Sequence, residues 1–490
     1  MAVNLSLLSP VFVLLLVGGG LFLYMALSGR SMPYTVQLVI ALCGLTLAGA
    51  LTIYFPYGIE AERILLNDPL SKFIKVSALL SAAILAALNP TRAKNDFQNT
   101  TFLPSLLIST VGLFVMASAS DLVALFFGME LAYLPVYLKN IIRSNDSAAP
   151  DRNKFYDSLS LISGAVFCAL GFALLYGLSG STNLIQMKIN FSLLFLSFQR
   201  IGPAFIVGAA LVIVGLVVKM GAAPFHLWWS WRTHERAQSS ISVTLFIGIM
   251  SGVIIVLKTL TNGLIAFSDD VMAPLNWPPL LSAFASLSIL WSAIVLLRAR
   301  SLGEFVTGFF MAQMGFLLVA LRIATVAGIV ASLFQCVTLL LTIILLTGAL
   351  NSIYSGFEKN HFSALRGVAK KAPARGIALI LCLASFAAVP YTGGFLARQK
   401  LIEATADIEL WWLLTLVILI SVLVAYRALR LIWTILSPPP ADENAVVLDM
   451  VDNYRTNITA LVGSILLVAV GVFPEPTIAL AVRVAESFMI

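Results

Sequence analysis

Two oppositely charged residues stand in segments that are otherwise apolar, and they are the residues best suited to chemistry. Glu130 lies midway along DLVALFFGMELAYLPVY, and Lys219 lies in LVVKMGAAPFHLW, five residues before Pro224. A charge at the centre of a bilayer costs about 2.5–3.5 kcal/mol on insertion scales, so it requires a partner or a function. A carboxylate and an amine on facing helices can pair, and a neighbouring charge can then change which of them holds the proton. We interpret Glu130 and Lys219 as a proton-handling pair, with a static pair that fixes helix packing as the alternative.

Other charged or titratable residues accompany this pair. Arg398 follows a glycine pair in GGFLARQKL, and His226 directly follows Pro224. His226 could relay protons, or it could donate a hydrogen bond to a backbone carbonyl that the proline leaves free. Lys258 lies nearer the end of its apolar segment, in VIIVLKTL, so its amine could instead extend to the membrane surface. Lys75, in KFIKVSALL, is interpreted in the same way.

The elements that must position these residues are membrane helices. Of the 490 residues, 60% are hydrophobic and only 11% are charged, whereas soluble domains carry about 25% charged residues. The apolar runs are continuous rather than alternating, which predicts an all-α polytopic membrane protein and favours helices over a β-barrel. We expect about fourteen transmembrane helices, the first of them retained rather than cleaved. They are predicted at 7–27, 35–54, 71–89, 102–118, 120–140, 156–177, 202–228, 240–262, 279–297, 303–322, 325–350, 375–397, 408–430 and 457–475.

The distribution of basic residues predicts the orientation of these helices. The odd-numbered loops between spans hold 19 Lys and Arg residues, and the even-numbered loops with the C-terminal tail hold 8. Because cytoplasmic loops are enriched in Lys and Arg, the odd-numbered loops are predicted in the cytoplasm and both termini on the opposite side of the membrane. The net charge of +7 is therefore explained by topology, and nucleic-acid binding is not expected because no basic face is clustered. The four cysteines fall within predicted spans and show no metal-binding spacing.

Two of the predicted helices are interrupted. The seventh breaks at Pro224, and the twelfth breaks over Pro390–Gly394, in VPYTGGF. Such breaks persist in a bilayer only where protein or a wet cavity satisfies the freed backbone groups. The breaks are five spans apart, and an odd offset inverts the second unit relative to the first, as in many transporters. The predicted divisions are 1–101 for helices 1–3, 102–262 and 279–430 for two inverted five-helix repeats, and 431–490 for a cytoplasmic loop and helix 14.

Several motifs together resemble the antiporter-like subunits of respiratory complex I, and most closely subunit N, the counterpart of mitochondrial subunit 2. They are NDPLSKFIKVSALL, SASDLVALFFGMELAYLPVYL, DRNKFY, YGLSGSTNL, VGLVVKMGAAPFHLW, SALRGVAKKAP and VPYTGGFLA, in matching order from about residue 60 onward. The resemblance implies two half-channels joined by a polar axis, in which Glu130 and Lys219 match the glutamate of helix 5 and the lysine of helix 7. Arg398 falls where helix 12 usually has a lysine.

The same resemblance implies a cellular setting. The chain would lie in a bacterial inner membrane beside other membrane-arm subunits, where redox chemistry drives protons through it. It would hold no cofactor itself, and FMN, iron–sulfur clusters and quinone are expected in partner subunits.

The sequence also departs from the family pattern. The lysine expected in the eighth helix falls at Ile249, the Lys-Arg pair of the tenth helix reads Gly303-Glu304, and its histidine reads Gln313. Arginine keeps a charge but scarcely releases a proton, so Arg398 is a poor carrier. Side chains such as Ser251 and Thr244, or water, would have to bridge the gap. Two alternatives therefore stay open: a conduction-impaired scaffold of the same complex, and a homologous subunit of a multisubunit cation/proton antiporter or a membrane-bound hydrogenase.

Overall fold

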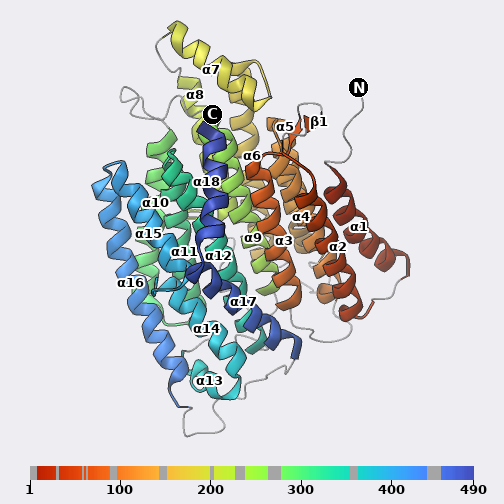
Figure 1. Ribbon diagram of the computed structural model, residues 1–490, viewed down its shortest axis with the longest axis vertical. Helices are drawn as coiled ribbons and strands as arrows, with labels where there is room; N and C mark the ends of the chain where they lie inside the picture. Colours follow the sequence, from red (N-terminus) through yellow and green to blue (C-terminus); the bar gives the residue numbers. More distant parts are fainter. Residues whose placement is uncertain are drawn as a thin grey trace.

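The structure is a computed structural model, and it is almost entirely helical (Figure 1). It describes residues 8–28, 32–57, 60–61, 64–88, 97–142, 152–198, 203–226, 238–262, 277–353, 362–438 and 454–489. Within these ranges the strand content is one short antiparallel pair, β1 (Glu60–Ala61) with β2 (Leu65–Leu66).

The bundle consists of helices that are long and apolar enough to cross a membrane. Twelve meet this description over their full length: α1 (Ser9–Ser28), α2 (Tyr34–Tyr54), α3 (Pro69–Leu88), α4 (Phe97–Ser118), α6 (Arg152–Ser179), α8 (Pro203–Met220), α9 (Gln238–Ile255) with its π-helical continuation η4 (Val256–Asn262), α10 (Trp277–Arg298), α11 (Leu302–Arg322), α12 (Val326–Ile353), α16 (Trp411–Leu436) and α17 (Tyr454–Val472). Two more spans are α5 (Leu122–Ile142) and the interrupted pair α14 (Pro373–Phe386) and α15 (Gly393–Asp407). The prediction of about fourteen membrane helices is confirmed.

The helices differ in how much of their surface the protein covers. The span of α9 and η4 is 100% buried and that of α12 is 94% buried, whereas α1 is 17% buried and α16 and α17 are each 28% buried. All of them have similar hydropathy, because a lipid-facing residue and a core residue are equally apolar. Hydropathy therefore locates the spans, but only packing shows that α9 and α12 form the centre.

Besides the short η7 (Phe362–Leu365) and α13 (Val368–Lys371), two helices of 15 residues each were not expected from the sequence. The α7 helix (Leu184–Phe198) connects α6 to α8 and projects from one end of the bundle, and α18 (Glu475–Met489) follows α17 and runs along the bundle (Figure 1). In α18 the residues Ala481, Val484 and Ala485 are buried, and the helix packs on α12 and α3. Its apolar face is narrow and its other face is charged, so its mean hydropathy is too low to mark it as a span. The predicted division 431–490 therefore contains two helices rather than one.

The neighbour relations among the helices recur along the chain. The α4 helix packs on α5, and α6 packs on α8; five spans later, α10 packs on α11, and α12 packs on both α14 and α15. The inverted relation of the two units stays a prediction. The sidedness also stays a prediction, because much of the basic loop sequence, including 143–151 and 354–361, lies outside the described residues.

The α8 helix, which carries Lys219, lies in close contact with α6. A Cβ atom added at Gly215 would lie 2.6 Å from the Cys168 sulfur, and one added at Gly171 would lie 2.6 Å from the Val212 side chain. Small residues at such positions let membrane helices approach closely, which is how van der Waals packing holds them together in lipid. The cysteines in the described residues are all free, and Cys168 is fully buried, as its interpretation as a small apolar residue predicts.

Candidate functional site

Glu130 and Lys219 form an ion pair inside the bundle. The Nζ atom of Lys219 lies 2.8 Å from Oε1 of Glu130, which joins α8 to α5. The Lys219 side chain is fully buried, whereas 28% of the Glu130 side chain is exposed at the molecular surface. Lysine sits in the last turn of α8, one residue before the helix ends at Met220. The structure therefore brings together the two residues that the sequence singled out.

Two tyrosines, which the sequence analysis did not identify, complete this site. Lys219 Nζ donates a second hydrogen bond to the Tyr137 hydroxyl at 2.7 Å, and this hydroxyl donates to Glu130 Oε2 at 3.2 Å. The ring of Tyr133 lies beneath the ammonium, with Nζ 4.1 Å from its centroid. Glu130, Tyr133 and Tyr137 have the spacing i, i+3 and i+7, so they share one face of α5. That spacing in ELAYLPVY was the available signal for both tyrosines.

The break after α8 is stabilised by several backbone contacts. Gly221 adopts a left-handed conformation, with φ of 68°, and the peptide bond between Ala223 and Pro224 is cis. The carbonyl of Lys219 accepts a hydrogen bond from the Tyr133 hydroxyl at 2.9 Å, and the Ala223 amide donates to Ser288 Oγ of α10 at 3.0 Å. Protein groups therefore satisfy the backbone that the break exposes, as a break within a membrane requires. The break was predicted at Pro224, and α8 ends four residues earlier, at Met220. Residues 227–237 lie outside the described part of the chain.

The second break is held by hydroxyl groups. Between α14 and α15, Ala388 and Tyr391 have positive φ angles of 54° and 67°. Thr392 caps α15 through its side chain, which accepts a hydrogen bond from the Phe395 amide. Ser385 Oγ accepts a hydrogen bond from the Gly394 amide at 3.2 Å and lies 3.3 Å from Thr342 Oγ1 of α12. The predicted break over Pro390–Gly394 thus occupies the six residues before Gly393.

Arg398 lies in α15, beyond this second break, and is buried without an acidic partner among the described residues. Its guanidinium carbon lies 3.4 Å from the centroid of the Phe316 ring, a stacking contact that suits a planar cation. The Nε and Nη1 atoms are buried and find no hydrogen-bond acceptor in the described residues. Arg398 is therefore a fixed internal charge, separate from the Glu130–Lys219 pair.

His226 and Lys258 do not join the central pair. The His226 ring packs against Trp291, with centroids 5.5 Å apart, and shares no hydrogen bond or ion pair with Glu130 or Lys219 in the described structure. The Lys258 amine donates to the Ala119 carbonyl at 2.7 Å and lies 3.7 Å from Asp68 Oδ2. Lys258 and Lys75 are each only 3% exposed. Extension to the membrane surface, which was one of two alternatives for Lys258 and the interpretation of Lys75, does not agree with this burial; the role of Lys258 in the site stays a prediction.

Neutral polar side chains connect α9, α11 and α12, three of the most buried helices of the bundle. Ile249 is fully buried and supplies no charge, but Ser242 Oγ of α9 donates to Thr347 Oγ1 of α12 at 2.9 Å. The Gln335 amide of α12 donates to the Gln313 carbonyl oxygen of α11 at 2.8 Å. Hydroxyl and amide groups therefore line the region where ionisable residues were expected, and Gln335 is a member that the sequence analysis missed.

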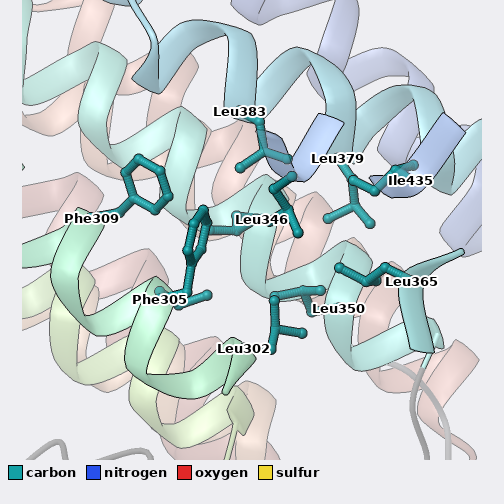
Figure 2. A pocket seen from close by; sticks show the side chains of 11 residues that line it. Leu302, Phe305, Phe309, Leu346, Leu350, Leu365, Leu379, Leu383 and Ile435 are labelled. Carbon is teal, nitrogen blue, oxygen red and sulfur yellow. The ribbon is translucent and has the colours of Figure 1, made fainter. Parts of the chain in front are cut away.

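A small cavity in the second half of the chain has an entirely apolar lining. Figure 2 shows Phe305 and Phe309 of α11, Leu346 of α12, and Leu379 and Leu383 of α14 around it. A cavity of this kind offers neither hydrogen bonds for water nor a group that can hold a proton. This cavity is therefore not a candidate site for a polar ligand or a titratable group.

The Tyr137 hydroxyl is expected to support the charged form of the pair. Replacing Tyr137 with phenylalanine removes one acceptor from Lys219 and one donor to Glu130, a loss of about 1–3 kcal/mol for groups that are buried and charged. If the pair handles protons, as the sequence predicts, the rate of proton transfer through the assembled protein is expected to fall about fivefold to 150-fold, with the yield unchanged. Tyr176→Phe on α6, where the side chain is 49% exposed, is the control. Equal activity in the two variants would show that the hydroxyl has no role.

Several known proteins are similar to this chain in sequence and in fold. The family model described as NADH:quinone oxidoreductase/Mrp antiporter, TM, matches residues 119–424. Subunit N of the NADH-quinone oxidoreductase of Granulibacter bethesdensis is 27% identical over 498 residues, covering 99% of this chain and 100% of that protein. The corresponding subunit of Thioalkalivibrio sulfidiphilus is 26% identical over 451 residues, or 89% of each chain.

Solved structures show the same fold at lower sequence identity. A chain of respiratory complex I from Thermus thermophilus superposes with a TM-score of 0.76, at 22% identity, over 96% of this chain and 99% of that one. A chain of the Mrp complex from Dietzia sp. DQ12-45-1b also gives a TM-score of 0.76, at 17% identity, over 99% and 98% of the two chains. The family match covers more than half of the sequence and includes Glu130, Lys219 and Arg398. The chain is an integral membrane protein that belongs to the NADH:quinone oxidoreductase/Mrp antiporter transmembrane family.

Proposed function

We propose that this chain is an antiporter-like membrane-arm subunit of a complex-I-type NADH:quinone oxidoreductase, in which it couples quinone reduction to proton translocation. The buried ion pair between Glu130 and Lys219 is the observation that carries the proposal. Its relatives in Granulibacter and Thioalkalivibrio are subunits N of that enzyme. The chain would act as a non-redox subunit of a translocase.

The pair can act as a switch because its two members have different surroundings. Glu130, Tyr137 and the Tyr133 ring enclose the Lys219 amine. The Glu130 side chain, in contrast, is partly exposed at the molecular surface. A charge that arrives beside Glu130 weakens its hold on the ammonium, and a buried lysine without its carboxylate readily gives up a proton. Because α8 ends one residue later, the lysine lies beside a break whose Pro224 is exposed at the molecular surface.

Beyond Lys219 the proton would travel through neutral groups. The Ser242–Thr347 and Gln335–Gln313 contacts and the Thr342–Ser385 pair provide hydroxyl and amide groups that water can connect. Arg398 would not carry the proton, because a guanidinium does not release one, but its charge would bias these groups electrostatically. This part of the route lies in the second predicted repeat.

The redox groups would belong to other subunits. We place FMN, the iron–sulfur clusters and the quinone site in partner chains, and this chain in a bacterial inner membrane with both termini on the periplasmic side. In the part of the chain that the structure describes, no group of three or more His, Cys, Asp and Glu side chains could hold a metal ion. The excess of basic residues in the odd-numbered loops supports the orientation.

The decisive variant is Glu130→Gln in the assembled enzyme. Glutamine keeps the shape and a hydrogen bond but loses the charge, so Lys219 loses its counter-ion. We expect NADH-driven proton pumping in proteoliposomes to fall about tenfold while the subunit composition stays normal. Normal pumping in a normally assembled Glu130→Gln enzyme would favour the conduction-impaired scaffold, which Ile249 and Arg398 also suggest.

A homologous subunit of a multisubunit cation/proton antiporter is the second candidate, because the Mrp chain has the same TM-score as the complex I chain. Mass spectrometry of the proteins that co-purify after mild solubilisation separates the two. Flavin- and iron–sulfur-containing NADH dehydrogenase subunits would support the proposed function. Antiporter subunits alone, or a nickel hydrogenase, would assign the chain to a related machine.

A further inference from the structure

A second cluster of charges includes a lysine of η4, which packs on α7, the helix that projects from one end of the bundle (Figure 1). It consists of Asp68, which directly precedes α3, Lys75 on α3, and Lys258 in the π-helical segment η4. The Lys258 amine lies 3.7 Å from the Asp68 carboxylate and donates to the Ala119 carbonyl at 2.7 Å. The helices therefore gather one acid and two lysines from segments almost 200 residues apart.

The charges in this cluster do not balance. Lys75 is 3% exposed and makes no hydrogen bond to the described part of the chain; its ammonium faces the Phe114 ring at 5.9 Å. Lys75 interacts electrostatically with Asp68, Lys72 and Lys258. Lys258 interacts electrostatically with Asp68. One carboxylate cannot neutralise two buried ammonium groups at once, and an unpaired buried charge is strongly unfavourable.

The carboxylate is held in place, whereas its lysine partners are only loosely bound to it. Asp68 Oδ1 accepts a hydrogen bond from the Ser71 amide at 2.6 Å, which caps the start of α3. Its other oxygen, Oδ2, faces Lys258 at a distance longer than a normal hydrogen bond. The Asp68 side chain is 23% exposed, so the cluster reaches the molecular surface.

We propose that Asp68, Lys75 and Lys258 form a second proton-exchange site, through which protons enter or leave at this end of the bundle. A proton passes from the ammonium of one lysine to the Asp68 carboxylate, and then to the free amine of the other lysine or to water. Transfer from one lysine to the other begins and ends with one carboxylate and one ammonium and passes through a neutral carboxyl with two free amines, so the cluster is neutral at each stage. A proton that is given to water is replaced by one that arrives along the route of Lys219. This inference rests on the proposed function, because it gives the route of Lys219 an outlet.

The test measures NADH-driven proton pumping and NADH oxidation in proteoliposomes that contain the intact purified complex. Asp68→Asn, Lys75→Met and Lys258→Met are each expected to lower pumping about tenfold, since each removes a proton-exchanging group. Lys188→Met is the matched control: it removes a lysine of α7, at the same end of the bundle, whose charge is not among those that act on Lys75 or Lys258. It is expected to pump normally, and a loss equal to that of the cluster variants would overturn the proposal.

Two further variants separate proton exchange from a structural charge. Lys75→Arg keeps the positive charge but cannot release its proton, so it is expected to assemble and yet pump poorly. The double variant Asp68→Asn with Lys258→Met removes the ion pair as a unit, which restores neutrality and assembly but not pumping. Normal pumping in either variant would show that the cluster only stabilises the fold, and would overturn the inference.

Glu130→Gln distinguishes failure of this inference from failure of the proposed function. If Glu130→Gln stops pumping while all three cluster variants pump normally, the proposed function stands and the second site is refuted. If Glu130→Gln also pumps normally, the chain conducts no protons, and both ideas fail together.

Discussion

Replacing Lys219 with methionine is expected to lower redox-driven proton pumping about tenfold or more, the largest functional effect of any single change in this chain. Methionine has a similar length and is apolar, so it fills the same volume but leaves Glu130 without a counter-ion. Removing one partner of a buried pair typically costs about 3–5 kcal/mol, far more than forming the pair gains. The measurement is the rate of NADH-driven acidification in proteoliposomes, divided by the rate of NADH oxidation.

The control for this variant is Lys400→Met. Lys400 pairs with Glu403 at 2.7 Å on α15, but both side chains are partly exposed, 33% and 45%, and exposed pairs contribute little. Lys400→Met is therefore expected to pump normally. If Lys219→Met also pumps at the normal rate in a fully assembled complex, the Glu130–Lys219 pair has a packing role only.

Replacing Gly394 with alanine is expected to prevent the chain from accumulating in membranes, the largest structural effect. A Cβ atom at this position would lie 1.9 Å from the Ser385 carbonyl oxygen, and rotating a side chain cannot relieve a contact with backbone. The two helix ends at the second break would have to separate, which costs more than the roughly 1–3 kcal/mol of ordinary overpacking. The Gly394 amide would also lose its hydrogen bond to Ser385.

Immunoblotting of membranes, followed by native electrophoresis of the solubilised complex, measures this effect. Gly19→Ala on α1 is the matched control, because its added methyl group would meet nothing within 4 Å. Alanine is also favoured over glycine within a helix, so this variant is expected to accumulate normally. Equal amounts of the two variants would show that the α14–α15 junction can open to accept a side chain.

Local patterns in the sequence were enough to predict the helices and the charged pair. Membrane spans are about 20 apolar residues long whatever surrounds them, so hydropathy located fourteen spans and the composition excluded a soluble fold. Glu130 and Lys219 stood out for the same reason, since a charge within an apolar run is costly and therefore informative. Proline and glycine act through their own backbone, which is why both breaks were located to within a few residues.

Contacts between helices could not be predicted in this way. The π-helical turn at Lys258 and the rotation of α3 decide that Lys258 faces Asp68 rather than the membrane surface, and neither is encoded in hydropathy. Likewise, Tyr133 and Tyr137 look like interface aromatics in the sequence, because an aromatic residue in a span can face lipid, a headgroup or a charge. The amphipathic α18 was missed because the polar residues beside its narrow apolar face lower the mean hydropathy of the segment.

By itself, the sequence determined that this is a polytopic membrane protein with two broken helices and one buried acid–base pair. Only the tertiary structure decided which groups surround that pair, that Arg398 stacks on Phe316 with no carboxylate partner among the described residues, and that Gln335 bonds to Gln313. The physical reason is that insertion into a bilayer depends on each segment's own composition, whereas hydrogen bonds and ion pairs depend on how close packing rotates one helix against another.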